Sequence, residues 1–201
     1  MESSILDLNL HWGNLLRGAL AEYLHENCGD LDVSHTVKTP VRVQKFYQTM
    51  VAGEKEDPQE ILGTRFDTAK HDQMIIRRNI RVVSTCAHHI LPFVGKATFA
   101  YVPNEYIVGI SKIPRLVRCF SRRLQVQERL TDQIVDAFQD IVKPYGCALS
   151  IKAYHFCEIV RGAEEYAAPT ETTALRGTFK TNPETRAEFL RSVDKQETIF
   201  P

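Results

Sequence analysis

Apolar side chains along the first 50 residues recur at steps of three and four, the spacing of a helix that is buried along one face. A stripe of this kind runs from about Leu8 to Cys28, and Gly29 follows it as a stop signal. A second helix is expected to begin at Thr39, which would cap it, with Pro40 in the first turn. The pattern therefore predicts two helices in the N-terminal part of the chain.

Residues 54–70 separate these helices from the rest of the chain. They are mostly polar and are interrupted by Pro58 and Gly63, so we expect a loop with one short helical turn around Pro58. We accordingly predict a helical N-terminal region over residues 1–70 and a second domain over residues 71–201.

From Met74 onward the spacing changes to that of β-strands. Apolar runs predict strands over residues 74–83, 93–102 and 107–110. The stretch 147–160 alternates between apolar and polar residues, so we expect one long strand with a covered face.

Three helices are expected among and after these strands. One opens at residues 111–115, a longer one carries an apolar face over residues 130–142, and a short one follows Asn182 as its cap. A threonine-rich strand or loop spans residues 171–179. Two helices, then strands interrupted by a helix pair, then a strand and a terminal helix predict an α+β fold.

Composition narrows the class of protein without pointing to a function. The 201 residues are 43% hydrophobic and 25% charged, which suits a globular chain with a sizeable core. Lys plus Arg and Asp plus Glu both number 25, so net charge gives no reason to expect nucleic acid or a membrane surface as a partner. No apolar run approaches the ~20 residues of a membrane span, and no signal peptide is evident. Five cysteines, an odd number, favour a reducing cytoplasm over a disulfide framework.

The candidate chemistry lies in two short runs that are far apart in the chain. The first holds Cys86, His88 and His89, and the second holds His155 and Cys157 at a spacing of two. On a strand, residues two apart share a face, so His155 and Cys157 are expected to face one pocket. Two thiolates and one imidazole would bind zinc and leave a position open for water, and the two remaining imidazoles would form an acid/base pair. A buried thiol beside a satisfied core histidine is the alternative interpretation of Cys86 and His89.

Other polar groups could bind a substrate. Ser111, Lys112 and Arg115 surround a predicted helix start, which favours anions such as phosphate, and Arg161 follows the second run closely. Glu128 could accept paired hydrogen bonds from a guanidine-like edge such as that of guanine. For each of them an ordinary solvated side chain is the alternative, and no aromatic residues interleave the nearby arginines as nucleic-acid binding would favour.

Taken together, these motifs resemble those of the GTP cyclohydrolase I family. Five runs carry the resemblance: Cys86-Ala87-His88-His89, Gly109-Ile110-Ser111-Lys112, Arg122-Arg123-Leu124-Gln125-Val126-Gln127-Glu128-Arg129-Leu130-Thr131, His155-Phe156-Cys157 and Arg161-Gly162. The likeness extends from about Thr39 to Leu190, and the first ~35 residues match only in being helical.

The resemblance implies a tunnelling fold for the catalytic domain, an antiparallel sheet with helices on one face. It implies a toroidal homodecamer of two pentamers, with active sites between subunits. Zinc would be held by Cys86, His89 and Cys157. His88 and His155 would carry protons while an activated water attacks C8 of guanine, the imidazole ring opens and formate leaves.

The resemblance also implies how GTP would be held. Gln127 and Glu128 would bind the guanine, and Ser111 would act at the ribose during rearrangement and ring closure. The triphosphate would be bound by three cations, Lys112, Arg115 and Arg161. The product, 7,8-dihydroneopterin triphosphate, would feed the synthesis of folate and its one-carbon carriers, of tetrahydrobiopterin, or of deazaguanine bases.

Two features depart from the family pattern. Ala87 stands where the family usually has a glutamate between the cysteine and the first histidine, and Glu171 and Arg176 add charge to the threonine-rich segment. A missing carboxylate beside a metal site can lower activity or metal affinity. Ala87 therefore favours a second hypothesis, a catalytically impaired relative that keeps zinc for a regulatory or binding role. A purely structural zinc module is a third, and would need a fourth protein ligand.

Overall fold

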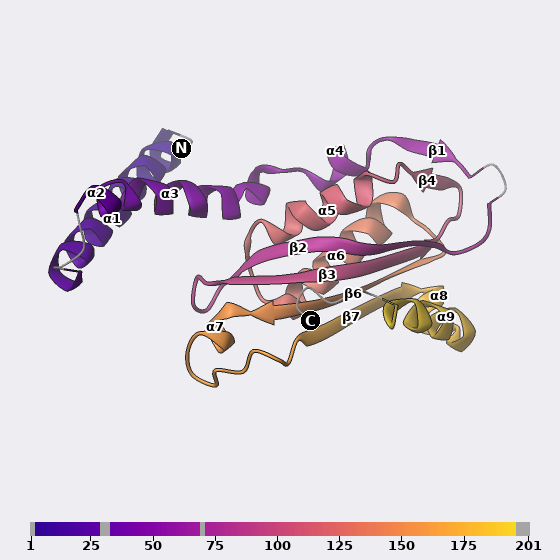
Figure 1. Ribbon diagram of the computed structural model, residues 1–201. Helices are drawn as coiled ribbons and strands as arrows, with labels where there is room; N and C mark the ends of the chain where they lie inside the picture. Colours follow the sequence, from indigo (N-terminus) through magenta and orange to yellow (C-terminus); the bar gives the residue numbers. More distant parts are fainter. Residues whose placement is uncertain (1–2, 29–32, 69–70, 196–201) are drawn as a thin grey trace. The chain divides into compact units, whose positions relative to one another are not determined.

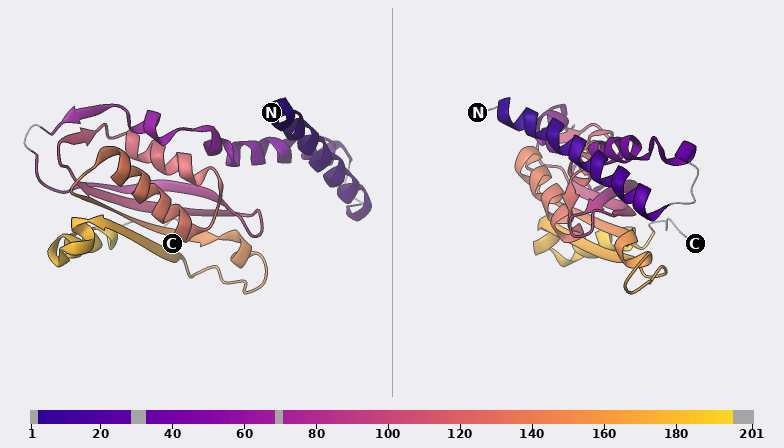
Figure 2. Two further views of the ribbon diagram at one scale, coloured as in Figure 1. Left: turned by 180° about the vertical axis from the view of Figure 1, so that it is seen from behind. Right: turned by 90° about the vertical axis from the view of Figure 1, so that its left-hand side faces the viewer.

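The computed structural model describes residues 3–28, 33–68 and 71–195 and divides into two compact units, Met1–Met50 and Val51–Pro201 (Figures 1 and 2). The first unit consists of three helices: α1 (Ser3–Asn27), α2 (Val33–Thr36) and α3 (Thr39–Met50). Within it α1 contacts α3. Both predicted N-terminal helices are confirmed, and α2 is an additional turn. In the described ranges, no helix combines the length and the apolar character needed to cross a membrane.

The second unit begins with short elements that precede the main sheet. These are η1 (Ala52–Lys55), α4 (Pro58–Leu62) and β1 (Arg65–Asp67), and β1 pairs antiparallel with β4 (Tyr106–Val108). The predicted helical turn at Pro58 is confirmed as α4, where the Asp57 carboxylate accepts a hydrogen bond from the Gln59 backbone N–H at 2.8 Å. The strand β1 was not predicted, because its three exposed residues show no apolar alternation.

Five strands form the main sheet of the second unit. Their order across the sheet is β5 (Leu124–Gln125), β2 (Ile75–Cys86), β3 (Pro92–Val102), β6 (Gly146–His155) and β7 (Thr170–Gly177). All neighbours are antiparallel except β5, which runs parallel to β2. The pairing of β2 with β3 shifts between Arg77 and Ile80, where Asn79 adopts a positive φ of 57°.

Helices α5 (Lys112–Ser121) and α6 (Gln127–Val142) cover one face of this sheet (Figure 2, left). The core between them is made of fully buried side chains, among them Phe93, Phe99, Leu116, Leu130, Ile134, Phe138, Leu149 and Ile151. Each such side chain stabilises the fold by roughly 1.5–3 kcal/mol relative to an exposed one. The α+β class, the antiparallel sheet and its helix-covered face are therefore confirmed.

The opposite face of the sheet is covered at one end by a smaller cluster. Helices α8 (Thr178–Thr181) and α9 (Pro183–Val193) place Phe179 and Phe189 over Ala100 and Ala148, which are small enough to admit the two rings. The predicted Asn182 cap is confirmed, since its side-chain oxygen accepts hydrogen bonds from the first turn of α9.

The long strand predicted over residues 147–160 is wrong beyond His155. There the chain turns into the short helix α7 (Phe156–Ile159), closed by a hydrogen bond from the Val160 N–H to the Phe156 carbonyl at 3.1 Å. The physical reason is that β3, the neighbour of β6, begins at Pro92, so nothing pairs with the chain after His155. Cys157 therefore belongs to a helix, and the two-residue spacing does not place it on a strand face with His155.

Candidate metal centre and active site

A cavity of about 240 Å³ opens at the end of the main sheet where β2 and β6 finish and α6 begins. Apart from Val126, its lining is polar or titratable: Cys86, His88, His89, Gln125, Gln127, Glu128, His155, Cys157, Glu158 and Thr170. Segments that are distant in sequence thus meet here: the β2–β3 turn, β5 with the start of α6, the β6–α7 junction and the start of β7.

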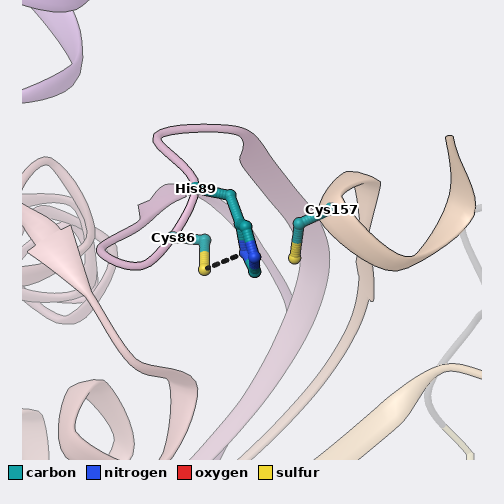
Figure 3. A group of neighbouring side chains, drawn as sticks. All are labelled: Cys86, His89 and Cys157. Atoms are coloured by element: carbon teal, nitrogen blue, oxygen red, sulfur yellow. Dashed lines mark hydrogen bonds between the residues drawn. The ribbon is translucent and has the colours of Figure 1, made fainter. Parts of the chain in front are cut away.

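The predicted metal ligands Cys86, His89 and Cys157 come together in this cavity (Figure 3). Cys86 ends β2, and a tight turn follows in which the Ile90 N–H bonds to the Cys86 carbonyl at 2.9 Å. Ile90 has a positive φ of 56°, and this turn carries His89 back so that its Nδ1 lies 4.0 Å from the Cys86 Sγ. Cys157 approaches from α7, and the three donor atoms all lie within 4.8 Å of one another.

The geometry of this group suits a small tetrahedral cation. Donors about 2.0–2.3 Å from one zinc ion lie roughly 3.5–4 Å apart, so only a slight contraction of the observed group is needed. Among the described residues, the group has three protein donors, which leaves a fourth position for water or substrate. His89 is exposed, so it does not fit the alternative interpretation of a satisfied core histidine.

The two thiols also have the electrostatics of a cation site. Burial raises the pKa of the Cys157 thiol, and the neighbouring Cys86 raises it further. Two adjacent thiolates are unfavourable without a compensating positive charge, and a bound divalent cation supplies that charge. The group could therefore hold a metal ion.

The two predicted proton carriers occupy different settings. His88 is exposed on the β2–β3 turn, with its ring centroid 6.2 Å from that of His89. His155 is stacked on Phe93 at 4.7 Å, and its Nε2 lies 2.7 Å from the Gln127 Oε1. Burial lowers the pKa of His155, and the carboxylates of the nearby acidic residues oppose this shift. Burial therefore favours the neutral form of the His155 ring.

The remaining predicted site residues fall into two groups. Gln127 and Glu128 start α6 and line the cavity; Gln127 is buried, whereas Glu128 is exposed. Ser111, Lys112 and Arg115 lie at the start of α5, which follows β4 at the opposite end of the sheet from the β2–β3 turn (Figure 1).

The residues that line the cavity include neither the Ser111–Lys112–Arg115 cluster nor Arg161. Arg161 is exposed just after α7. Within one copy, the structure thus brings together the metal and imidazole residues but separates them from the Ser111–Lys112–Arg115 cluster.

Four residues of the cavity wall were missed in the sequence, the apolar Val126 and three polar ones. Gln125 supports the β2–β3 turn, since its carbonyl accepts the Ala87 N–H at 2.9 Å while its side chain donates to the Phe120 carbonyl at 3.0 Å. Glu158 adds a second carboxylate, and its position beside Cys157 was the signal that could have found it. Thr170 enters from β7, and no local pattern links it to the site.

The two unusual charges of the threonine-rich segment make contacts within the chain. Glu171 accepts a hydrogen bond from the Ser150 hydroxyl at 2.8 Å. Arg176 forms ion pairs with Asp136 at 2.7 Å and with Asp132 at 2.8 Å, which tie β7 to α6. Both charges thus have a structural explanation on this chain.

Comparison with known proteins identifies the family. The sequence profile described as GTP cyclohydrolase I matches residues 16–194. The chain belongs to the GTP cyclohydrolase I family. The match begins at residue 16, earlier than the resemblance near Thr39 had indicated. The antiparallel sheet with α5 and α6 on one face is the arrangement expected of this family's tunnelling fold.

Curated relatives agree with this assignment. The GTP cyclohydrolase 1 of Chlorobium chlorochromatii is 48% identical over 159 residues, which cover 79% of this chain and 71% of that protein. The GTP cyclohydrolase 1 of Leptospira biflexa is 44% identical over 175 residues, 87% of this chain and 96% of that protein. That of Campylobacter concisus is 42% identical over 165 residues, 82% and 87% respectively. Among solved structures, an archaeosine synthase QueF-Like in the apo form aligns with 52% of this chain at a TM-score of 0.44 and 16% identity.

Proposed function

We propose that this member of the family is a zinc-dependent GTP cyclohydrolase I, which hydrolyses GTP to 7,8-dihydroneopterin triphosphate and formate. The observation that carries the proposal is the cavity itself. It gathers a cysteine–histidine–cysteine group, a half-buried histidine and an exposed carboxylate in a chain whose curated relatives bear this name. The product would serve pterin, folate or deazaguanine synthesis.

Zinc would be held by Cys86, His89 and Cys157, whose soft thiolates and imidazole match its preferences. When bound, it would supply the Lewis acidity that makes a water molecule nucleophilic near neutral pH. The two thiolates would lower the net charge of the site, and the open fourth position would leave room for the substrate.

The imidazoles would move the protons of ring opening. Neutral His155 can accept a proton from the attacking water, and exposed His88 can donate one to the purine nitrogen that leaves C8. Ser111 would assist at the ribose in the later rearrangement and ring closure. Positioned acid/base groups of this kind contribute about 10²–10⁴-fold to a rate.

Guanine would be recognised at the start of α6. The exposed carboxylate of Glu128 lines the cavity and can accept two hydrogen bonds from the N–H edge of the base. Gln127 was predicted to hold guanine as well, but both ends of its side-chain amide are hydrogen-bonded to the protein itself. The triphosphate would be bound by three cations, Lys112, Arg115 and Arg161.

We further propose that the chain assembles into a homodecamer of two pentamers with active sites between subunits. What supports this is the separation, within one copy, of the cavity from the Ser111–Lys112–Arg115 cluster (Figure 1). A second copy would bring its α5 to the cavity of the first. We place the assembly in the cytoplasm, a location that the five free cysteines support.

A catalytically impaired relative is the second candidate. Ala87, exposed in the β2–β3 turn, favours it because no carboxylate is available at this position to orient the neighbouring histidines. A purely structural zinc module has less support, because the donor group contains three described ligands.

The test is incubation of the zinc-loaded protein with GTP, following formate and the fluorescence of the oxidised pterin. We expect both products, and expect neither from a Cys157→Ser variant. Formate without pterin would place a defect after ring opening, at Ser111 or the rearrangement. Neither product, with one zinc bound per chain, would favour the impaired relative.

A further inference from the structure

Gln127 occupies an unusual position for a residue that would bind a substrate. Only 1% of its surface is exposed, although it lies in the cavity wall. Both ends of its side-chain amide are hydrogen-bonded to the protein itself. An amide bonded in this way has little hydrogen-bonding capacity left for a ligand, so its partners within the protein indicate its role.

The nitrogen end of the Gln127 amide is held by two backbone carbonyl oxygens. Gln127 Nε2 lies 3.0 Å from the Ile151 carbonyl oxygen and 3.0 Å from the Thr170 carbonyl oxygen. A backbone carbonyl can only accept hydrogen bonds. In a flipped amide, the Gln127 Oε1 would therefore point at two carbonyl oxygens with no proton between them. The chemistry of the surroundings therefore sets the orientation of this amide.

A closed ring of hydrogen bonds reinforces this orientation. Thr131 donates its hydroxyl proton to the backbone carbonyl of Gln127 at 2.7 Å. The hydroxyls of Thr131 and Thr172 also lie 2.7 Å apart, so Thr172 must supply the proton of that contact. The Thr172 oxygen is then an acceptor for Gln127 Nε2, which lies 3.2 Å away. The two Nε2 protons of Gln127 thus have three acceptors within reach, the two carbonyls being the nearer, and the threonine hydroxyls join α6 to β7.

The oxygen end of the amide then determines the state of His155. Gln127 Oε1 lies 2.7 Å from His155 Nε2 and can only accept, so Nε2 must carry a proton. In the neutral ring the lone pair consequently sits on Nδ1. Stacking on Phe93, at 4.7 Å and an interplanar angle of 12°, fixes the plane of the ring, and the bond to Gln127 fixes its rotation within that plane.

We propose that Gln127 is a positioning residue, which holds His155 as the Nε2–H tautomer with Nδ1 as its proton-accepting atom, and that it does not itself contact the base. Only the kinetic part of this inference rests on the proposed function, since the tautomer is a property of the protein alone. The inference assigns the recognition of guanine to Glu128 and the preparation of the proton acceptor to Gln127.

The tautomer can be read by solid-state ¹⁵N NMR of the full chain labelled with [¹⁵N]histidine, at about pH 8, where a histidine of ordinary pKa is neutral. The His155 signals are assigned by their loss in a His155→Gln variant. We expect a protonated Nε2 and an unprotonated Nδ1. A wild-type His155 protonated on Nδ1 would overturn the proposal, whether or not the protein turns over GTP.

A variant separates positioning from direct binding. Gln127→Met keeps the length of the side chain but removes the acceptor of His155, so we expect the Nε2–H tautomer to lose its dominance. With GTP as substrate, kcat should fall roughly ten- to a hundredfold while KM changes by less than about threefold. A tenfold rise in KM with kcat and the tautomer unchanged would assign Gln127 to the base and overturn the proposal.

Thr172→Val is the matched control. It removes the weakest partner of Gln127 Nε2 and leaves both carbonyl acceptors in place, so we expect the wild-type tautomer and a kcat within about threefold. A switched tautomer in this variant would show that the two carbonyls do not fix the amide, contrary to the proposal. This control and the wild-type spectrum still decide if Gln127→Met does not fold.

Discussion

Polar groups are buried and hydrogen-bonded at one end of the main sheet and exposed at the other. At the cavity end, Gln127 is buried and bonded on both sides, and His155 is held between it and Phe93. At the other end, Ser111 and Arg115 are exposed at the start of α5, and Ser111 makes no capping hydrogen bond through its side chain. One end is organised within a single copy, and the other has its polar groups directed to the surroundings.

This difference teaches where each part of the proposed reaction is prepared. Proton transfer needs a fixed geometry and a defined tautomer, and these are stabilised most effectively by buried hydrogen bonds. Binding of a triphosphate needs positive charge, which a hydrated side chain can supply without a fixed position. In the proposed reaction the cavity end would therefore carry the groups of the chemistry and the base-binding Glu128, and the α5 end the cations that bind the triphosphate.

The largest effect is expected from His155→Ala, which removes the organised group at the cavity end. Product formation should fall by about 10²–10⁴-fold, because a positioned acid/base group is lost, while bound zinc and assembly stay unchanged. Formate release, metal content and sedimentation measure these three properties. His71→Ala, an exposed histidine elsewhere in the chain, is the control and should behave as wild type. Retained turnover in His155→Ala would remove His155 from its role.

A smaller and different effect is expected at the other end. Lys112→Ala should raise KM for GTP about tenfold or more, since a charge-assisted hydrogen bond to phosphate is worth ~1.5–3 kcal/mol, and should leave the metal content intact. Steady-state kinetics measure it, with the exposed Lys180→Ala as the matched control. An unchanged KM would mean that the α5 cluster does not take part in binding, and the comparison between the two ends would fail.

Arg176→Met tests a contact that belongs to neither end's chemistry. The ion pairs of Arg176 with Asp132 and Asp136 are partly exposed, so their loss should lower the free energy of unfolding by only ~1 kcal/mol. Denaturant unfolding measures this change. The kcat should stay at the wild-type value, and a large fall would mean that the link from β7 to α6 supports the cavity.

The smallest effect is expected from Ala87→Glu. The position is exposed in the β2–β3 turn, so the larger side chain can be accommodated without a change of fold, and turnover should hold or rise by a few-fold. GTP turnover at saturating zinc measures it. A collapse of activity would show instead that the site has adapted to alanine.

Much of this arrangement could be predicted from the sequence, because it depends on local patterns. The apolar spacing predicted α6 and the approach of β2 to Cys86, and the two histidine–cysteine runs predicted the group that the structure assembles. The helix α7 could not be predicted. The spacing of two between His155 and Cys157 suggested one continuous strand, whereas the two residues line the same cavity from a strand end and from a helix.

The role inferred for Gln127 depends on contacts that no local pattern reveals. Its partners on β6 and β7 lie 24 and 43 residues further along the chain, and they meet it only because those strands pair beside α6. The sequence showed a glutamine next to a candidate guanine ligand, and only the fold shows that its amide is already fully bonded.

The most direct test of the account is complementation between the two ends. His155→Ala and Lys112→Ala chains would be co-expressed in equal amounts with different tags and the mixed assemblies purified by both tags. Turnover is measured with GTP well below the wild-type KM, where His155→Ala alone is nearly inactive and Lys112→Ala alone retains about a tenth of wild-type turnover or less. If a site takes its cavity from one copy and its α5 from another, random mixing leaves about one quarter of the sites intact, and GTP turnover should return to about that fraction of wild type. Turnover no higher than in the separate variants would mean that both ends must come from one copy, and would contradict the account.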